Sequence, residues 1–522
     1  MTPAHAPGVP HASPPWRRVV LLALAGVIAG CAQLPPREST PPQAALAPAE
    51  EGVIAARTVP AEQAHPGESG FRLVANGTEA YALRTYSAQS ATSSLDIQTY
   101  IWHADLTGRL LARQALLAAD RGVRVRILVD DLDARAKNEG LAALDAHPNI
   151  EVRLYNPMAS RSGALGKVGG FGTDFKRLNH RMHNKSWIVD GRIALVGGRN
   201  LGDEYFGASE GPNFVDLDML MVGRVVREVG HNFDRFWNAE SNYPIAQLSP
   251  GMATVERLEA LRRTLDASAA ELERSAYRQV LHDDPDVQRV LEGGGGLHWS
   301  AQWRFASDDP MKGRLPPEQR SEVVRLLLPE ITGSQSRLLV ISPYFVPGEA
   351  GTRALVGADR RGVDVRVLTN SLAANDVAAV HGGYSRYRPE LLEGGVGLWE
   401  LKPSGGPASF SLSGSSGSSL HTKAMVIDGD TVFVGSYNLD PRSTSLNSEQ
   451  GVLVTHPALA SELAGIFQSQ SNGVHAWQVT MDAEGKLRWN DGDATWTREP
   501  ESTASQRALA WLMRILPVES QL

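Results

Sequence analysis

An internal duplication is the feature that most constrains how this chain can fold. The stretch AADRGVRVRILVDD (118–131) returns as GADRRGVDVRVLTNS (357–371). The spacing is nearly constant, since Gly362 follows Gly122 by 240 residues and His421 follows His183 by 238. Similarity at one offset over this length indicates two copies of the same structural unit. We therefore expect two similar domains that pack about a pseudo-twofold axis.

Both copies alternate strand patterns with helical patterns. In the first copy, strands at 93–102, 123–131 and 150–156 alternate with helices at 106–122 and 141–147. The second copy has strands and helices in turn at 337–345, 350–362, 363–371, 387–395 and 396–403. This β-α-β-α-β order is typical of a mainly parallel sheet flanked by helices. The predicted fold class is α/β, with two similar α/β/α sandwich domains and a helical connecting insertion.

Composition shifts along the chain suggest its boundaries. A long amphipathic helix is expected at 254–281, between the two copies. Gly/Ser-rich loops at 160–172 and 404–419 each precede a His-x-Lys element, either as flexible connections or as a lid. The expected organisation is a signal peptide (1–30), a Pro/Ala-rich tether (31–65), a first domain (66–245), a helical connecting region (246–335), a second domain (336–475) and a C-terminal tail packing on the domains (476–522).

The N-terminus has the pattern of a secretory signal. Arg17 and Arg18 precede the apolar run 19–30, and Cys31, the one cysteine of the chain, follows at once. The run is too short for a comfortable membrane span. Residues 28–31 resemble the bacterial lipobox, which implies cleavage before Cys31 and lipid attachment to its thiol; the alternative is an uncleaved signal anchor. We expect a bacterial envelope protein that is lipid-anchored in the periplasm, with the outer membrane favoured because Ala32 replaces the aspartate associated with inner-membrane retention.

Each copy also contains a histidine and a lysine at one edge of the sheet. Side chains alternate along a strand, so His183 and Lys185 share a face, as do His421 and Lys423. An Asp-Gly step follows each pair and predicts a hairpin turn. The returning strand brings Asn200 back near the first histidine. In the second copy it brings Ser436 and Asn438 back in the same way.

This combination of residues favours displacement at phosphorus. Two lysines would repel a cation, no metal-binding spacing is evident, and no GxSxG nucleophile elbow occurs. One neutral imidazole can attack phosphorus while the other, protonated, gives a proton to the leaving alkoxide. The lysines and asparagines would stabilise charge on the non-bridging oxygens. We expect neither a cofactor nor a metal.

The doubled pattern His-x-Lys-x4-Asp, then six residues and Gly-(Ser/Gly)-x-Asn, resembles the HKD motifs of the phospholipase D superfamily. His183, Lys185 and Asp190 match in full, as do His421, Lys423 and Asp428; Gly198 stands where the family usually has serine. The resemblance covers nearly everything after the tether. Stretches such as LDIQTYIW, HPNIEVRLYNP, DDPMK and LPVESQL are similar to the bacterial cardiolipin synthase C subgroup.

The resemblance also implies roles for individual residues. His183 would be the nucleophile and His421 the general acid, although the sequence itself does not distinguish them. Glu449 and Asp216 would orient the histidines, with Asp218 as an alternative to Asp216. Asp190 and Asp428 would belong to the catalytic set or would act structurally at their turns.

A further group after the second copy's middle strand could contact substrate. His381, Tyr384 and Arg388 lie close together in VHGGYSRYR, and arginine suits phosphate. We expect Tyr384 and Arg388 to contact a phosphate or headgroup, the alternative being a solvated helix face.

The implied reaction is phosphatidyl transfer that forms cardiolipin from phosphatidylglycerol and another phospholipid at a membrane surface, through a covalent phosphatidyl-histidine. Hydrolysis to phosphatidic acid is the nearest alternative. A secreted nuclease is disfavoured because 51 basic against 58 acidic residues give a net charge of −7. A non-enzymatic lipoprotein scaffold is disfavoured by the intact His and Lys pairs. The oligomeric state and the acceptor alcohol stay open.

Overall fold

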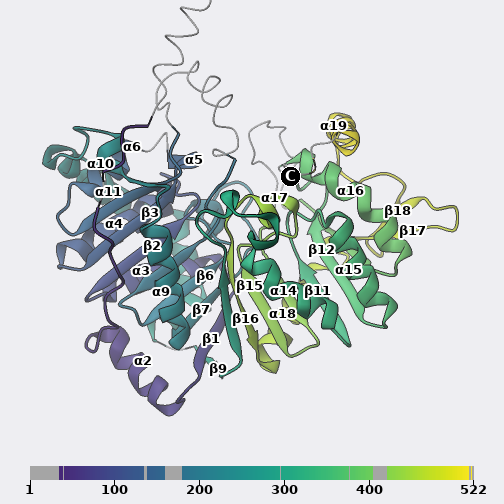
Figure 1. Cartoon of the computed structure of the whole chain (residues 1–522), viewed down its shortest axis with the longest axis horizontal. Helices are drawn as coiled ribbons and strands as arrows, with labels where there is room; N and C mark the ends of the chain where they lie inside the picture. Colours follow the sequence, from purple (N-terminus) through teal and green to yellow (C-terminus); the bar gives the residue numbers. More distant parts are fainter. Residues whose placement is uncertain are drawn as a thin grey trace, which may run out of the picture.

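The computed structural model describes residues 34–38, 40–134, 138–158, 179–293, 295–375, 377–403, 420–516 and 519. The first half of the chain forms one α/β unit and the second half another, and the two stand side by side (Figure 1). The predicted signal peptide, Cys31 and the two Gly/Ser-rich loops lie outside the described residues.

Within the described residues the first unit contains a nine-stranded mixed sheet. Its central strands are parallel, β2 to β3 and β3 to β4, and the other neighbours are antiparallel. The order is β8 (Asn242–Pro244), β4 (Ile150–Tyr155), β3 (Arg124–Asp130), β2 (Ser94–Thr99), β5 (Ser186–Val189), β6 (Ile193–Gly197), β7 (Asp218–Gly223), β1 (Ser69–Val74) and β9 (His298–Ser300).

The second unit contains a ten-stranded sheet on the same plan. The order is β10 (Trp303–Ser307), β16 (Gln450–Thr455), β15 (Thr431–Gly435), β14 (Ala424–Ile427), β11 (Arg337–Ile341), β12 (Asp364–Asn370), β13 (Gly397–Leu401), β17 (Ala476–Met481), β18 (Leu487–Asn490) and β19 (Thr495–Trp496). Strands β11 to β13 are parallel, as β2 to β4 are. The run β13-β12-β11-β14-β15-β16 matches β4-β3-β2-β5-β6-β7, so the predicted duplication and α/β fold class are confirmed.

Helices cover both faces of each sheet. Local sequence signals bound α4: the Asp105 side chain caps its start, and Gly122, with φ 94°, lies in the turn that leads from α4 to β3. In the first unit lie α2 (Val53–Ala64), α3 (Gly77–Ser90), α4 (Leu106–Asp120), α5 (Asp131–Ala134), α6 (Asn138–Asp145), α9 (Arg224–Trp237) and α10 (Ile245–Leu248). In the second lie α14 (Glu322–Gly333), α15 (Gly348–Arg360), α16 (Ala378–Glu393), α17 (Pro441–Ser445), α18 (Pro457–Gln470) and α19 (Ala504–Ile515).

One hydrophobic core belongs to both units. It joins Phe233 and Trp237 of α9, Leu463 and Phe467 of α18, and inward-facing residues of both sheets in a single cluster. All four of these side chains are almost completely buried. Because the cluster takes residues from both copies, removing either unit would expose a large apolar face of the other. The relative position of the two units is therefore set by packing.

The two predicted Asp-Gly hairpin turns are present. Asp190 and Gly191 have φ values of 55° and 62°, and Asp428 and Gly429 have 52° and 79°. Two successive left-handed residues suit the twist of the antiparallel pairs β5–β6 and β14–β15. These turns lie at the end of β5 and β14 that is remote from the histidines.

The predicted tether differs from what is observed. Its described part, from residue 34 onward, lies against the first unit: Arg37 donates to the Asn242 carbonyl at 2.8 Å, and the Ala45 N–H donates to Asp234 at 2.7 Å. Residues Val53–Ala64 form α2 instead of an extended chain. Repeated hydrogen bonds to the domain, which composition does not reveal, hold this segment in place.

The connecting region is largely helical, as expected, but it also contributes one strand to each sheet. The expected helix 254–281 is broken at Ser275 into α11 (Val255–Arg274) and α12 (Ala276–Asp283), because Ser275 caps the second helix; α13 (Pro285–Leu291) follows. Strand β9 then joins the first sheet and β10 the second. The expected C-terminal tail likewise adds β17, β18 and β19 to the second sheet. None of the helices in the described residues is long and apolar enough to span a membrane.

Candidate active site

The two His-x-Lys segments meet where the two units touch. The backbone N–H of His183 donates to the backbone carbonyl of Ser448 at 2.9 Å. The backbone N–H of His421 donates to the backbone carbonyl of Val215 at 2.8 Å. Both bonds cross from one unit to the other, and they correspond under the pseudo-twofold axis. The segment before β5 is thus fixed to the one before β16, and the segment before β14 to the one before β7.

Each histidine is paired with an acid of the opposite unit. Nδ1 of His183 lies 2.8 Å from Oε2 of Glu449, and Nδ1 of His421 lies 2.6 Å from Oδ2 of Asp216. Both carboxylates are buried. With Nδ1 bound to an acid, Nε2 of each ring is the nitrogen left for chemistry.

The structure also distinguishes the two candidate aspartates. Asp218 accepts from Arg84 at 2.9 Å and lies 3.4 Å from Arg199, so it forms a structural ion-pair group behind the site. Asp216 is the residue that contacts His421. In strand order the two differ by one full repeat and share a face, which is why the sequence left both open.

The two lysines are buried beside the histidines. Lys185 Nζ donates to the carbonyl of His183 at 2.7 Å, and Lys423 Nζ donates to the carbonyl of His421. The Tyr100 ring lies 5.2 Å from the His183 ring and 5.3 Å from Lys185 Nζ. Burial lowers the pKa of Lys185 well below its usual range, against the raising effect of Glu449. These cations have little water around them and suit a phosphate anion.

Burial and the neighbouring lysines keep both histidines neutral at rest. Burial, and then Lys185 and Lys423, lower the pKa of His183 well below its ordinary value. Burial and Lys423 lower the pKa of His421 to about 4, although Asp216 raises it. Each histidine is affected by the lysines of both motifs, so the two motifs share one electrostatic environment.

The two acids differ in their ionisation. Burial raises the pKa of Glu449 to about 7, although Lys185 lowers it. Burial also raises the pKa of Asp216, but His421 and Lys423 lower it below its usual value on balance. At neutral pH His421 therefore faces a fully ionised acid, whereas His183 faces one near its midpoint. This asymmetry is a property of the fold that the duplicated motifs do not reveal.

The motif asparagines are both buried but not equivalent. Asn200 accepts from the Ile101 N–H at 3.2 Å and donates to the Tyr205 hydroxyl at 2.8 Å. The Tyr205 ring in turn packs edge-on against His421, 5.3 Å between centroids. In the described part of the chain, Oδ1 of Asn438 is buried and has no hydrogen-bond partner. Asn200 positions the wall of the site, and a phosphate contact stays a prediction for both asparagines.

The serine-to-glycine difference between the motifs has a steric cause. Ser436 Oγ donates to Glu449 at 2.5 Å in the second unit. At the corresponding Gly198, an added Cβ would lie 2.2 Å from Oδ1 of Asp216. Asp is one methylene shorter than Glu, so its carboxylate occupies the space that a serine side chain would need. Each unit therefore fits a carboxylate against the opposite histidine in its own way: the first uses Gly198 with Asp216, and the second uses Ser436 with Glu449.

Asp190 and Asp428 differ from their predicted catalytic role. The Asp190 carboxylate accepts from the backbone N–H groups of Thr92, Ser93 and Ser94, at 2.8 to 3.1 Å. Asp428 binds the N–H groups of residues 335–337 in the same way. Each aspartate ties its hairpin turn to the start of the adjacent strand, at the opposite end of β5 or β14 from the histidine. The structure therefore assigns both to the fold.

The predicted substrate contacts of Tyr384 and Arg388 are wrong. Arg388 is buried and donates to Glu400 at 3.1 Å and to Glu499 at 2.5 Å, with the Tyr384 ring against its guanidinium. His381 also contacts Glu499, at 2.9 Å. Both of the carboxylates that bind Arg388 come from outside α16, which the local pattern could not indicate. This cluster fixes α16 to β13 and to the C-terminal segment.

Several residues that support the site were missed. Asp130 accepts from the Met182 N–H at 2.9 Å, and Asn370 occupies the equivalent place against Leu420. Both stand at the last position of a central parallel strand, where polar side chains commonly reach a site. The DDPMK stretch supplies Asp308, which accepts from the Glu449 N–H at 3.0 Å.

A separate polar group lies at the edge of the site. Among the described residues, His103, Asp105 and Glu204 form the one group that could hold a metal ion. His103 Nδ1 is 3.0 Å from Glu204, and Asp105 already accepts from the N–H groups of Gly108 and Asp203. Because these contacts satisfy the group without an ion, we assign no metal to it.

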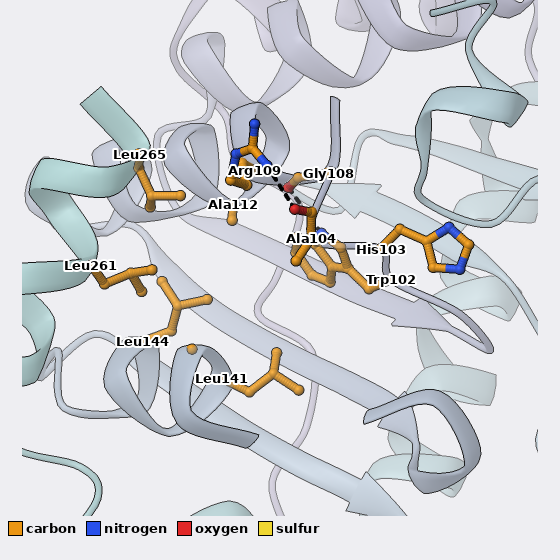
Figure 2. Close-up of a pocket in the computed structure, with 11 residues that line it drawn as sticks. Trp102, His103, Ala104, Gly108, Arg109, Ala112, Leu141, Leu144, Leu261 and Leu265 are labelled. Carbon is orange, nitrogen blue, oxygen red and sulfur yellow. Dashed lines mark hydrogen bonds between the residues drawn. The ribbon is translucent and has the colours of Figure 1, made fainter. Parts of the chain in front are cut away.

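A small apolar cavity of about 90 Å³ lies beside His103. It is lined by Trp102 and by leucines of α6 and α11, and Figure 2 shows the His103 ring directed away from those leucines. The Trp102 indole donates to the Gly108 carbonyl at 3.0 Å.

Comparisons with known proteins agree with this geometry. A family model described as "Cardiolipin synthase, PLD-like domain" matches residues 87–237 and 327–470. The chain is 43% identical over 479 residues to cardiolipin synthase C of Escherichia coli (strain K12), covering 89% of this chain and 99% of that protein. It is 27% identical over 398 residues to a cardiolipin synthase of a Geobacillus species, covering 76% of this chain and 65% of that one. Phosphatidylserine synthase of Haemophilus influenzae Rd KW20 shares the fold, with a TM-score of 0.55 at 13% identity, covering 89% of this chain and all (100%) of that one.

The fold and the paired motifs define a member of the phospholipase D superfamily. Within that superfamily, the chain belongs to the cardiolipin synthase-like phosphatidyltransferases. It is therefore an enzyme of phospholipid metabolism.

A Gly198→Ser variant tests the steric account of the acid pairs. The new Cβ would displace the Asp216 carboxylate from His421, so we expect kcat to fall by about 100-fold or more while the melting temperature changes little. The measurement is phospholipid turnover, with calorimetry to check folding. The double variant Gly198→Ser/Asp216→Glu copies the Ser436–Glu449 pair and should recover part of the loss. Unchanged turnover in the single variant would contradict this account.

The pH dependence should report Glu449. Its carboxyl pKa is raised to about 7, so the group is protonated below that pH and ionised above it. The ionised form can only accept from Nδ1–H of His183, which leaves Nε2 unprotonated for attack, whereas the protonated carboxyl can donate to Nδ1 and so favour the tautomer with the proton on Nε2. We expect kcat/KM to rise as pH increases through about 7 and a Glu449→Gln variant to lose that limb along with most activity. A limb near pH 7 that survives in Glu449→Gln would assign it to another group.

Proposed function

We propose that this enzyme forms cardiolipin from phosphatidylglycerol and a second phospholipid through a covalent phosphatidyl-histidine. The observation that carries the proposal is the pair of crossed acid–histidine contacts with a buried lysine beside each histidine. One imidazole with a free Nε2 for attack, and a second that is protonated when the anionic substrate binds, suit a two-step exchange at one phosphorus. The name of the 43% identical relative from Escherichia coli supports the choice of product.

In the first step, Nε2 of His183 attacks the phosphorus of the donor. Binding of the anionic donor favours uptake of a proton on Nε2 of His421. A P–N bond then forms as the P–O bond to the leaving group breaks, and His421 gives that proton to the leaving oxygen. Lys185 and Lys423 stabilise the charge on the non-bridging oxygens, a role that metal ions have in other phosphoryl enzymes. The bound phosphatidyl group then waits on His183.

In the second step, His421 changes from general acid to general base, and His183 becomes the leaving group. His421, now neutral, takes the proton from a glycerol hydroxyl of the acceptor as the hydroxyl oxygen attacks phosphorus. The P–N bond breaks, and His183 returns to its neutral form. If water replaces the alcohol, the same steps give phosphatidic acid, which is the alternative outcome.

The ionisation of the two acids favours this assignment of roles. Asp216 has a lowered pKa and faces His421, so it stabilises that ring as an imidazolium. Glu449, with its pKa raised to about 7, stabilises charge less well and instead fixes the tautomer of His183. The general acid needs the charged form, and the nucleophile needs the neutral one.

A lipid assay tests the function. Purified protein is incubated with phosphatidylglycerol, with and without phosphatidylethanolamine, in EDTA, and the products are separated. We expect cardiolipin from the wild type and none from His183→Ala, with no loss in EDTA because lysines neutralise the phosphate. An Asp190→Asn variant, altered at the remote turn, serves as the matched control and should retain activity. Phosphatidic acid as the sole product would favour hydrolysis, and nucleic-acid cleavage would favour the nuclease.

We further propose that the enzyme is anchored to the bacterial envelope by lipid on Cys31, with the outer membrane favoured. The lipobox-like sequence at 28–31 supports this localisation. In cells grown with a labelled fatty acid, the wild type is expected to carry the label and a Cys31→Ser variant is expected to lack it. Equal labelling of both proteins, or of neither, would disprove the anchor.

A further inference from the structure

The C-terminal helix α19 presents an apolar face to solvent. Trp511 is 63% exposed and Ile515 is 59% exposed, with Leu512 and Leu516 beside them. Within the described residues, these four account for four of the thirteen exposed large apolar side chains, in a stretch of six positions. Single exposed apolar residues are ordinary, but a contiguous set marks an interaction surface.

The charges on α19 are all of one sign. Its sequence ASQRALAWLMRI contains Arg507 and Arg514 and no acidic residue. Arg386 of the adjacent α16 is also about half exposed, although it pairs with Glu519. The whole chain has a net charge of −7, whereas the exposed surface of α19 is cationic and apolar. Such a combination suits an anionic lipid surface.

Helix α19 is capped at its start and packed against α16 in the structure. Its exposed apolar face is therefore not needed to hold the helix in place. A capping box between Thr503 and Gln506 starts the helix. Its other face packs so closely on α16 that a Cβ at Gly382 would lie 2.7 Å from the Ala510 carbonyl. Ala510 and Gln506 are buried in this contact. The face with Trp511 and Ile515 therefore points outward from a rigid support.

The helix lies on the same edge of the molecule as the catalytic histidines. Gly382 is near the start of α16, which follows the end of β12. The last residue of β12, Asn370, binds Leu420, next to His421. Figure 1 shows α19 at the upper edge with α16 and α17, and α2 at the opposite edge. Other exposed apolar residues stand at strand ends on this upper edge: Leu132 after β3, Val377 after β12 and Val474 before β17.

We propose that α19, with the neighbouring apolar residues of this edge, docks the enzyme on a phospholipid bilayer and brings the catalytic centre to headgroup level. The proposal rests on the function proposed above, because a phosphodiester in a bilayer lies at the interface and must be reached from the edge that carries the histidines. Tryptophan is suited to that depth, since its ring is apolar and its N–H can remain hydrated. Arginines on the same helix would meet the phosphates.

A single-site probe tests docking directly. Because Cys31 is the one cysteine, Ile515→Cys in a Cys31→Ser background gives one labelling position for an environment-sensitive fluorophore. Val53→Cys on α2, 46% exposed at the opposite edge, is the matched control. With vesicles of phosphatidylglycerol and phosphatidylethanolamine, we expect a blue shift at 515 and none at 53. Absence of a shift at 515, or an equal shift at both positions, overturns the proposal.

A kinetic comparison separates docking from chemistry. We expect a Trp511→Ala/Ile515→Ala variant to lose at least about tenfold in kcat/KM on vesicles and to match the wild type on a short-chain phospholipid below its micelle concentration. Val53→Ala should change neither. Equal losses on both substrates would overturn the docking role.

If the wild type turns over no phospholipid at all, the proposed function fails, and the fluorescence result still decides docking. A blue shift that depends on protein concentration without lipid would indicate a second copy and overturn the bilayer as partner.

Discussion

The site depends on two hydrogen bonds that cross between the units. Glu449 of the second unit holds His183 of the first, and Asp216 of the first holds His421 of the second. Neither half can orient its own histidine, so the two units must be docked before either ring is placed. The shared core around α9 and α18 supplies that docking by burying apolar residues of both sheets in one cluster. Packing in the shared core thus aligns the two acid–histidine pairs. In turn, the geometry of these pairs requires that the two units pack in one particular relative position.

The two halves each place an acid against the opposite histidine, but the carboxylates of the two acids differ in ionisation. Gly198 with Asp216 and Ser436 with Glu449 place a carboxylate against the opposite histidine in different ways. Burial raises the pKa of both acids. At Asp216 the effects of His421 and Lys423 outweigh burial and the pKa is lowered on balance, whereas the pKa of Glu449 is raised to about 7. The proposed mechanism, with one neutral and one charged imidazole, uses this difference, which comes from the different surroundings of the two acids.

The sequence predicts what is encoded locally and repeated. The α/β class, the duplication, the Asp-Gly turns and the His-x-Lys pairs follow from short patterns that appear twice. It predicts less well what depends on partners distant in the chain. From its local sequence Arg388 is predicted to contact phosphate, but in the fold Glu400 and Glu499 bind its guanidinium. Asp190 is likewise predicted to be catalytic, but in the fold its carboxylate accepts from the backbone at the start of β2. Asp216 and Asp218 share a strand face, so only the docked second unit distinguishes them. The sequence predicts a tail where strands β17 to β19 form, because the pairing of β17 with β13 is not a local property.

Charge balance links substrate binding to the proton that the chemistry needs. Two lysines face two carboxylates in the buried centre, and the histidines are neutral at rest, since the pKa of His421 is lowered to about 4. A phosphodiester adds one negative charge to this enclosed group. In a medium of low polarity that charge favours uptake of one proton, and the ring beside the ionised Asp216 is where an imidazolium is best stabilised. The donor anion therefore raises the proton affinity of His421 when it arrives, while the Glu449 contact keeps Nε2 of His183 available. Under the proposed mechanism, the protonated form of His421 that acts as general acid is therefore formed when the substrate binds, and little of it is present in the empty site.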